Sequence, residues 1–267
     1  MIEYKLITWT FDDEITIYPI SDVHLGSLEH NATEWRKFCE KINNEPNSYV
    51  ILGGDLINNA TKSSVSNVFE EVLRPQEQKE RMVAFLKPIK HKILCAVGGN
   101  HERRSMKDAD CDPMRDVMVK LDLEDIYREN MAFMKIQILN YKTNNNRSHN
   151  CYNAYTFAVT HGAGGGVLTG SSVNKNERYG YAIDGLDCLI VGHTHKGVVS
   201  KPAKLVIDPR NDKVSIKPFT VITSQAWMNY GGYAMQKMML PTSCASSEYP
   251  QKLVLEKGKN KNIKVIW

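Results

Sequence analysis

Residues 93–102 read ILCAVGGNHE, an apolar run of strand length that ends in two glycines and is followed at once by polar side chains. Four other strand-like runs also end in short polar clusters. In chain order the five clusters are Asp22 and His24, Asp55, Asn100 and His101, His161, and His193 and His195. Parallel strands present their carboxyl ends at one edge of a sheet, where open α/β folds bind ligands. The pattern therefore predicts that all five clusters meet.

The side chains in these clusters are those that bind divalent first-row metals. Carboxylate and amide oxygens and imidazole nitrogens suit such ions, and no thiolate is present to favour a closed structural zinc site. The candidate metal ligands are Asp22, His24, Asp55, Asn100, His161, His193 and His195. Seven ligands exceed the need of one four-coordinate ion but suit two ions that share a carboxylate. Asp55 is the candidate bridge because it stands alone, beside Gly53 and Gly54, which allow a sharp turn close to the metals.

Together these motifs resemble the signature of the calcineurin-like metallophosphoesterases over about residues 15–197. The matching segments are Ser21-Asp22-Val23-His24, Gly54-Asp55, Gly99-Asn100-His101-Glu102, Thr160-His161-Gly162 and Gly192-His193-Thr194-His195. The resemblance implies an α/β fold, a four-layer αββα sandwich of two mixed β-sheets flanked by helices. It also implies phosphoester hydrolysis by a hydroxide that bridges two divalent metal ions. Mn²⁺ is the expected metal, with Fe, Zn, Ni and Co as alternatives.

The same resemblance implies roles for single residues. One metal would be surrounded by Asp22, His24, Asp55 and His195, and the other by Asp55, Asn100, His161 and His193. His101 would bind no metal and would act with Asp55 as a catalytic residue, protonating the leaving group as a general acid.

Candidate substrate-binding residues are Asn100, Arg103 and Arg104. A guanidinium group can clamp two phosphate oxygens, which makes both arginines candidates. Either arginine could instead pair with a nearby carboxylate, and Glu102 could brace its loop rather than take part in chemistry.

Other metal folds fit the sequence less well. His193-Thr194-His195 alone is also typical of metallo-β-lactamases, but these would need Asp and His where the chain has Lys196 and Gly197. An amidohydrolase would place such a pair on its first strand, and no Walker-type loop follows the first strand here. A noncatalytic protein-binding module with a degenerate metal site is an alternative of another class, which the complete ligand set disfavours.

The sequence separates possible substrates only in part. Protein phosphatases of the family carry an arginine soon after Gly-Asp, whereas this chain continues Leu56-Ile57-Asn58-Asn59. This difference favours a phosphodiesterase over a protein phosphatase. We expect a nucleotide or nucleic-acid substrate, with a phosphomonoesterase (nucleotide or protein phosphatase) as the alternative. Gly-Asp-Leu is similar to the DNA repair exonuclease branch, but the chain leaves no room for that branch's added DNA-binding domain.

The glycine-rich stretch 162–166 and the arginine after Asn-His-Glu are similar to a branch of the family often carried by bacteriophages. The stretch could bind an anion through its bare amides. We expect instead that it lets the chain pass close to the metals or acts as a mobile cover.

Length and composition indicate a single catalytic domain over residues 1–267. No apolar run is long enough for a membrane span and no secretory signal is present, so we expect a cytoplasmic protein that contacts a phosphoester substrate and no membrane. The six scattered cysteines indicate reduced thiols. The net charge of +4 and the lysine-rich tail do not by themselves indicate nucleic-acid binding. The oligomeric state stays open, and His30, His91 and His149 are expected to be solvated.

Apolar periodicity predicts alternating strands and helices in the first half and mainly strands in the second. The predicted strands are 4–10, 15–20, 49–52, 93–97, 153–160, 188–191, one near Leu205, 219–223, 253–255 and 263–266. The predicted helices are 33–42, 78–85 and 113–121.

Overall fold

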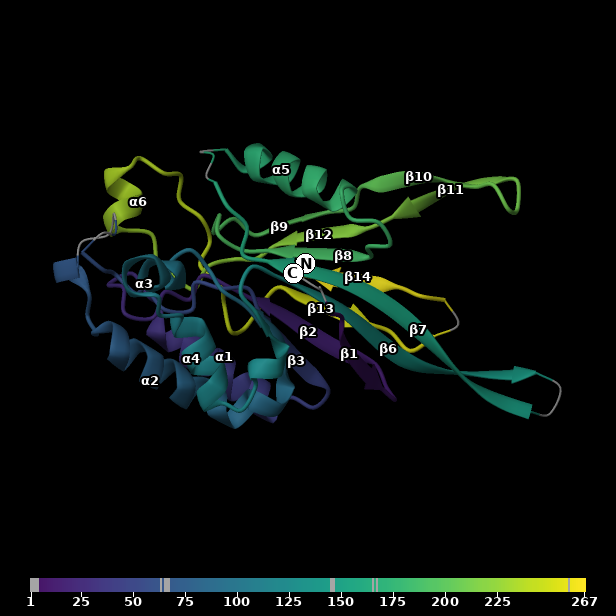
Figure 1. The fold of residues 1–267 in the computed structure, drawn as a ribbon, viewed down its shortest axis with the longest axis horizontal. Helices are drawn as coiled ribbons and strands as arrows, with labels where there is room; N and C mark the ends of the chain where they lie inside the picture. Colours follow the sequence, from purple (N-terminus) through teal and green to yellow (C-terminus); the bar gives the residue numbers. More distant parts are fainter. Residues whose placement is uncertain are drawn as a thin grey trace.

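Two six-stranded sheets pack face to face at the centre of the protein (Figure 1). The computed structural model describes residues 5–62, 64, 68–144, 147–164, 166, 168–258 and 260–267, and the side chains of 140–150 and Tyr233 are not described. Tyr4, Gly165, Lys259 and the side chain of His149, which entered the sequence predictions, thus lie outside the described residues.

The first sheet, sheet I, has the strand order β14-β13-β2-β3-β4-β5. Strands β2 to β5 run parallel, and β13 pairs antiparallel with β2. The strands are β2 (Ile15–Ile20), β3 (Ser48–Leu52), β4 (Ile93–Val97), β5 (Tyr127–Arg128), β13 (Lys252–Leu255) and β14 (Ile263–Ile266).

The second sheet, sheet II, has the order β1-β6-β7-β8-β12-β9. β7, β8 and β12 run parallel, whereas β6 and β7 form a long antiparallel hairpin. The strands are β1 (Ile7–Phe11), β6 (Met131–Asn144), β7 (Arg147–Thr160), β8 (Cys188–Val191), β9 (Val198–Ser200) and β12 (Thr220–Thr223). A separate hairpin of β10 (Ala203–Asp208) and β11 (Lys213–Pro218) projects from the body (Figure 1).

Helices cover the outer faces of both sheets. α1 (Ala32–Asn44), α2 (Pro75–Leu86) and α4 (Pro113–Lys120) pack on sheet I, and α5 (Thr169–Tyr181) lies over sheet II (Figure 1). The remaining helices are short: α3 (Glu102–Ala109), α6 (Gly232–Gln236) and the 3-10 turns η1 (Val68–Glu70), η2 (Lys87–Lys92) and η3 (Glu124–Ile126).

The alternation of side chains along each strand produces this layering. On β3, Val50 and Leu52 face the helices, whereas Ile51 faces sheet II. On β8, Ile190 packs between the sheets and Leu189 packs in the cluster beneath α5. Strands with both faces buried are apolar throughout, because successive side chains point to opposite faces. The predicted four-layer αββα sandwich is therefore confirmed.

Helix α1 shows how local signals set the elements. The side chain of Asn31 caps the helix by accepting a hydrogen bond from the backbone N–H of Glu34 at 3.2 Å. Trp35, Phe38 and Ile42 recur at helical spacing and are buried on one face against sheet I.

Four strands, 15–20, 93–97, 188–191 and 263–266, have the predicted bounds, and most other predicted elements are shifted by a few residues. β7 begins at Arg147 rather than at Asn153. The sequence did not predict β5, β6, β9, β11, α3, α5 or α6. No helix of the described part has the length and apolar character that crossing a membrane requires. All six cysteines are free thiols, as predicted.

Truncating Ile51 to alanine should destabilise the fold, because Ile51 is fully buried between the two sheets. We expect a loss of about 2 to 5 kcal/mol in the free energy of unfolding, measured by urea denaturation and circular dichroism. Ile207, which is 74% exposed on the β10–β11 hairpin, provides the control, and Ile207→Ala should cost less than about 0.5 kcal/mol. Equal losses in the two variants would contradict this layering.

Candidate metal centre

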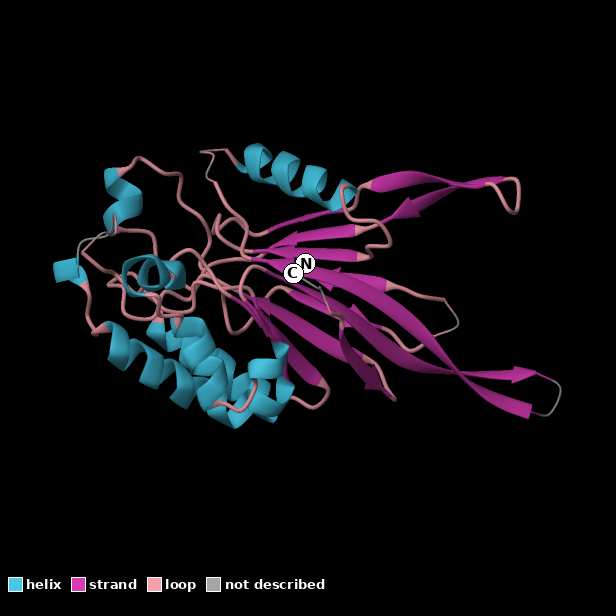
Figure 2. Ribbon diagram, viewed as in Figure 1, coloured by secondary structure: helices cyan, strands magenta, loops and turns pink. Residues whose placement is uncertain are grey.

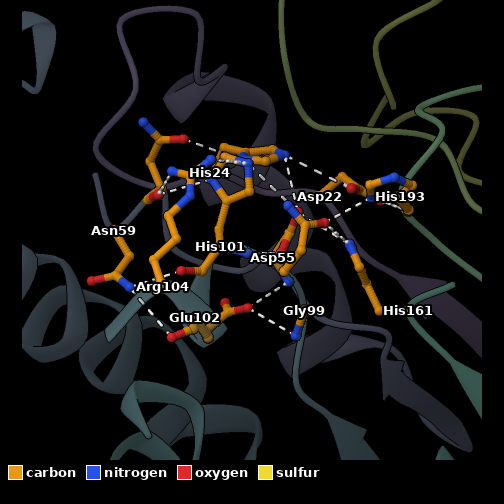
Figure 3. Close-up of polar contacts among 12 residues, drawn as sticks. Asp22, His24, Asp55, Asn59, Gly99, His101, Glu102, Arg104, His161 and His193 are labelled. Carbon is orange, nitrogen blue, oxygen red and sulfur yellow. Dashed lines mark hydrogen bonds and ion pairs between the residues drawn. The ribbon is translucent and has the colours of Figure 1, made fainter. Parts of the chain in front are cut away.

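Five loops, each following a strand, bring the candidate ligands together at one end of the two sheets (Figure 2). Loops after β2, β3 and β4 come from sheet I, and loops after β7 and β8 come from sheet II. Asp22, His24, Asp55, His161 and His193 point toward one another (Figure 3). The structure therefore places side chains from both halves of the chain in a single site.

The first group of ligands contains Asp22, His24 and His195. The Nε2 atoms of His24 and His195 lie 3.2 Å apart, and they lie 3.7 and 3.3 Å from Asp22 Oδ1. This oxygen is buried and has no hydrogen-bond partner among the described residues. A buried carboxylate oxygen without a partner is costly, so the arrangement calls for a cation between these three atoms.

The second group contains Asp55, His161 and His193, with Asn100 among them. Asn100 Oδ1 lies 2.9 Å from His161 Nε2 and 2.7 Å from His193 Nδ1, and Asp55 Oδ2 lies 3.1 Å from His161 Nε2. Asp55 Oδ2 also lies 3.9 Å from His24 Nε2, so Asp55 stands between the two groups.

The protonation of His161 gives a test of whether a cation fits. Its Nδ1 lies 2.8 Å from Gly53 O and must donate to that carbonyl, which leaves Nε2 facing two oxygens that only accept. Although burial alone would lower the pKa of His161, the charge of Asp55 raises it to about 10. Either a proton or a metal ion must therefore occupy the position at Nε2.

The two buried aspartates keep their charge for the same reason. Burial would raise the pKa of Asp22 and of Asp55, but the surrounding histidines hold the pKa of both carboxyl groups well below the usual range. Two fixed anions among imidazoles match the ligand preferences of divalent first-row ions. Donors about 2.0 to 2.2 Å from one ion lie about 3.0 to 3.5 Å apart, close to most of the separations seen within each group.

Five of these ligands have left-handed backbone conformations, which non-glycine residues rarely adopt. They are Asp22, His24, Asp55, His193 and His195, with φ values of 54°, 48°, 52°, 70° and 57°. Hydrogen bonds between the loops stabilise this geometry: the N–H groups of Asp22 and His24 donate to Gly54 O and Asp55 O, each at 3.0 Å. The loops therefore hold one another in the conformation that turns each side chain inward.

A family model described as calcineurin-like phosphoesterase matches residues 15–197, the span that contains all five loops. The chain belongs to the calcineurin-like phosphoesterases. It is a hydrolase of phosphoester bonds, and the family implies divalent metal ions, which the aspartate and histidine groups described above could bind. A comparison with curated proteins gave no significant match.

Solved structures similar to this phosphoesterase share little sequence with it. A conserved protein of Streptococcus pneumoniae described as a predicted phosphoesterase is 10% identical, with a TM-score of 0.36 over 94% of this chain and 88% of that chain. A Haemophilus influenzae NAD nucleotidase is 11% identical, with a TM-score of 0.39 over 94% of this chain and 49% of that chain. A cold-active protein-tyrosine phosphatase of a Shewanella species is 12% identical, with a TM-score of 0.35 over 99% and 83%.

Glu102 braces the loops on which Asp55 and Asn100 lie. Its fully buried carboxylate accepts hydrogen bonds from four backbone N–H groups, those of Asp55, Leu56, Ile57 and Gly99, at 2.8 to 3.2 Å. Figure 3 shows the bonds to Asp55 and Gly99. Burial and the nearby charge of Asp55 raise the pKa of Glu102 to about 7. Of the two roles that the sequence left open for Glu102, its contacts correspond to the bracing role.

Gly99 is required where these loops meet. A Cβ atom at this position would lie 2.3 Å from the backbone nitrogen of Asp55 and 2.0 Å from its Oδ1. No larger residue fits without moving the Asp55 loop.

Asn58 orients two histidines of the phosphoesterase. Its side-chain Oδ1 lies 3.3 Å from His24 Nδ1, and its backbone oxygen lies 2.8 Å from His101 Nδ1. Its amide Nδ2 in turn donates to the carboxylate of Glu71. Both histidines therefore turn Nε2 toward the metal centre. No role for Asn58 was predicted from the sequence, where its segment was notable only for the absence of arginine.

His101 and the two arginines after it take different positions. His101 Nε2 lies 3.8 Å from Asp55 Oδ2 and accepts a hydrogen bond from Arg104 Nη2 at 3.0 Å. Arg104 Nη1 donates to Asn58 O at 3.0 Å, whereas Arg103 Nη2 donates to Glu129 O at 3.3 Å. The structure thus brings Arg104 to the metal centre and gives Arg103 a contact with the segment before β6.

The surroundings of His30 differ from those predicted from the sequence. We expected a solvated side chain, but His30 is half-buried and its Nδ1 bonds to Val23 O at 2.8 Å, between the ligands Asp22 and His24. Burial lowers the pKa of His30.

Replacing Glu102 with glutamine should destabilise the phosphoesterase, because the side-chain amide would place a donor against backbone N–H groups that need an acceptor. We expect a loss of at least about 2 kcal/mol in the free energy of unfolding at pH 8, where Glu102 is ionised. Urea denaturation of the metal-free and metal-loaded protein would measure it. Glu124→Gln, which removes an exposed ion pair with Arg115, should cost at most about 1 kcal/mol. A loss in Glu102→Gln no larger than in this control would exclude the bracing role.

Proposed function

We propose that this phosphoesterase is a phosphodiesterase that acts on a nucleotide or a nucleic acid and uses two divalent metal ions. One ion would be held by Asp22, His24, Asp55 and His195, and the other by Asp55, Asn100, His161 and His193. The observation that carries the proposal is that Asp55 belongs to the second group of ligand atoms and its Oδ2 lies 3.9 Å from His24 of the first group, with His101 and Arg104 nearby.

Two bound divalent ions would polarise the phosphoryl oxygens and lower the pKa of the water that attacks phosphorus. The protein's own contribution is to hold the metal ligands in fixed orientations. Asp55 is held from three directions: Glu102 binds its backbone N–H, Oδ1 accepts the N–H of His101 at 2.8 Å, and Oδ2 faces His161. This rigidity presents the bridging carboxylate in one orientation.

His101 is proposed to protonate the leaving-group oxygen through Nε2. Its Nδ1 is held by Asn58 O, so a proton can be delivered only from Nε2. Burial, His24 and Arg104 lower the pKa of His101 to about 3 in this arrangement. A bound phosphodiester adds a negative charge and draws Arg104 away from Nε2, and both changes raise the pKa of His101.

Arg104 is the arginine proposed to bind the phosphoryl oxygens. Its Nη2 donates to His101 Nε2 and its Nη1 donates to Asn58 O, each at 3.0 Å, so the guanidinium group lies beside the candidate ligands. Arg103 was predicted from the sequence to share this role. Because its Nη2 donates to Glu129 O, we propose a structural role for it instead. Asn100 remains a proposed contact for both metal and substrate.

A diester fits the charges of the site better than a monoester. A phosphodiester carries one negative charge, whereas a phosphomonoester carries nearly two near pH 7. Arg104 is the single guanidinium with a described contact to His101, and no arginine stands among Leu56-Ile57-Asn58-Asn59 directly after Gly54-Asp55. The preference for Mn²⁺, the cytoplasmic location and the similarity to the bacteriophage branch stay predictions from the sequence.

The proposal is tested by turnover in the presence of Mn²⁺ on a bis-aryl phosphate, a mono-aryl phosphate, cyclic nucleotides, and single- and double-stranded DNA. We expect the bis-aryl phosphate and at least one nucleotide or nucleic-acid diester to be hydrolysed faster than the mono-aryl phosphate, and all turnover to stop with a chelator. Faster hydrolysis of the mono-aryl phosphate would replace the proposal with a phosphomonoesterase.

Two substitutions should separate proton delivery from metal binding. His101→Ala should retain both metals and lower kcat by about a hundredfold to ten-thousandfold, the usual contribution of a general acid. Asp55→Asn should lose both metal and turnover because the shared ligand loses its charge. Metal analysis of the purified variants together with steady-state kinetics would measure this, and a fully active, metal-free Asp55→Asn would refute the assignment.

A further inference from the structure

A cavity of about 250 Å³ lies beside the metal centre, between α5 and the loop after β8. Thr194, which lines it, stands between the candidate ligands His193 and His195. On another side the cavity is lined by Ala163, two residues after His161. The cavity therefore adjoins the loops that carry three of the proposed ligands, and it is smaller than the sites that hold drug-sized molecules.

The cavity is positively charged. Lys175 of α5 lines it and donates through Nζ to Ala163 O. A second ammonium group, that of the buried Lys196, donates to Gly166 O on the same wall at 2.6 Å. No carboxylate lines the cavity among the described residues. A small polar ligand bound here would therefore be an anion.

Two hydroxyl groups at this cavity have no hydrogen-bond partner among the described residues. Ser172 is 4% exposed and lines the cavity, and its Oγ has no partner; the same holds for the buried Oγ1 of Thr194. Asn176, on the same lining, is satisfied by donating to Thr223 Oγ1 at 3.0 Å. An unpaired buried hydroxyl costs about 1 to 3 kcal/mol, which a bound acceptor would recover.

The first turn of α5 adds to the positive potential. The residue before the helix, Leu168, offers no side-chain cap to the first backbone N–H groups. Uncapped amides at a helix N-terminus attract anions. Ser171 and Ser172, the third and fourth residues of α5, line the cavity.

We propose that this cavity binds a second phosphate group of the substrate, adjacent to the phosphodiester that is cleaved. The inference rests on the proposed function and narrows its substrate to molecules with two neighbouring phosphates, in a nucleic-acid strand or in a nucleoside diphosphate ester. The donors come from Lys175, Ser172, Thr194 and the start of α5. From the sequence alone, the bare amides of residues 162–166 were considered as anion donors, but we expected this stretch to let the chain pass close to the metals or to act as a mobile cover.

Matched substrates test this proposal. The first pair is the thymidine dinucleotide with and without a 5′-phosphate, and the second is the p-nitrophenyl esters of thymidine 5′-diphosphate and 5′-monophosphate. In at least one pair we expect kcat/KM to be about 10 to 100 times higher for the member with the second phosphate, as one charge-assisted hydrogen bond provides. The pair with the higher ratio identifies a strand or a nucleotide as the source of the second phosphate.

Variants locate the effect in the cavity. Lys175→Gln and Ser172→Ala should each lower that kcat/KM ratio severalfold or more, and Lys175→Glu should lower it further. Ser172→Ala removes a hydroxyl without a partner, so the fold should tolerate it. Lys217→Gln, which removes the same charge from the exposed strand β11, should keep the wild-type ratio.

Failure of the proposed function and failure of the second-phosphate site would give different results. If no diester in either pair is hydrolysed, the proposed function fails. If both members of each pair are hydrolysed with ratios near one, or if Lys175→Gln keeps the wild-type ratio, the second-phosphate site is overturned and the proposed function stands.

Discussion

The buried charge of Asp55 is the constraint around which the candidate metal centre of this phosphoesterase is arranged. Its carboxylate lies between the two groups of ligands, 3.1 Å from His161 Nε2 and 3.9 Å from His24 Nε2. A lone carboxylate in this position would be strongly unfavourable, since burial penalises the charged form. The imidazoles around it, the N–H of His101 and the fixed loop beneath it compensate for that penalty. Removing the charge would leave those groups oriented toward a partner that no longer attracts them.

The loop that carries Asp55 is held in place by the buried carboxylate of Glu102, which bonds to backbone N–H groups. Glu102 accepts hydrogen bonds from four backbone N–H groups and thereby joins the loop after β3 to the loop after β4. Helix α3 begins at the same residue, directly after Asn100 and His101. A single side chain thus fixes the spacing between the proposed bridging ligand and the proposed general acid.

The sequence correctly predicted that the candidate ligands meet at one end of the sheets, because that convergence depends on local patterns. Apolar runs such as 93–97 have strand length, and each is followed by polar residues whose order matches a family signature. Helix α5 was missed because Gly170, Ser171 and Gly180 weaken its helical pattern; Gly180 is needed because a Cβ there would lie 2.4 Å from the ring of Phe219. The partners of Asn58 and His30 depend on contacts across the fold, which spacing along the chain does not encode.

The distance along the chain between touching ligands has a consequence for how the protein is made. His24 and His195 are 171 positions apart, as are Asp22 and His193, yet each pair is in contact. Pairings of such high contact order form late in folding. Strands β2, β3 and β4 of sheet I can pair while later strands are still being synthesised, but sheet I is complete only after β13 and β14 have been added. Both proposed cation sites need a histidine of the loop that follows β8, His193 for one and His195 for the other, so neither site exists before that loop has docked. Metal uptake at these sites therefore follows the docking of that loop, and an ion bound between ligands from both sheets would stabilise the folded state against separation of the sheets.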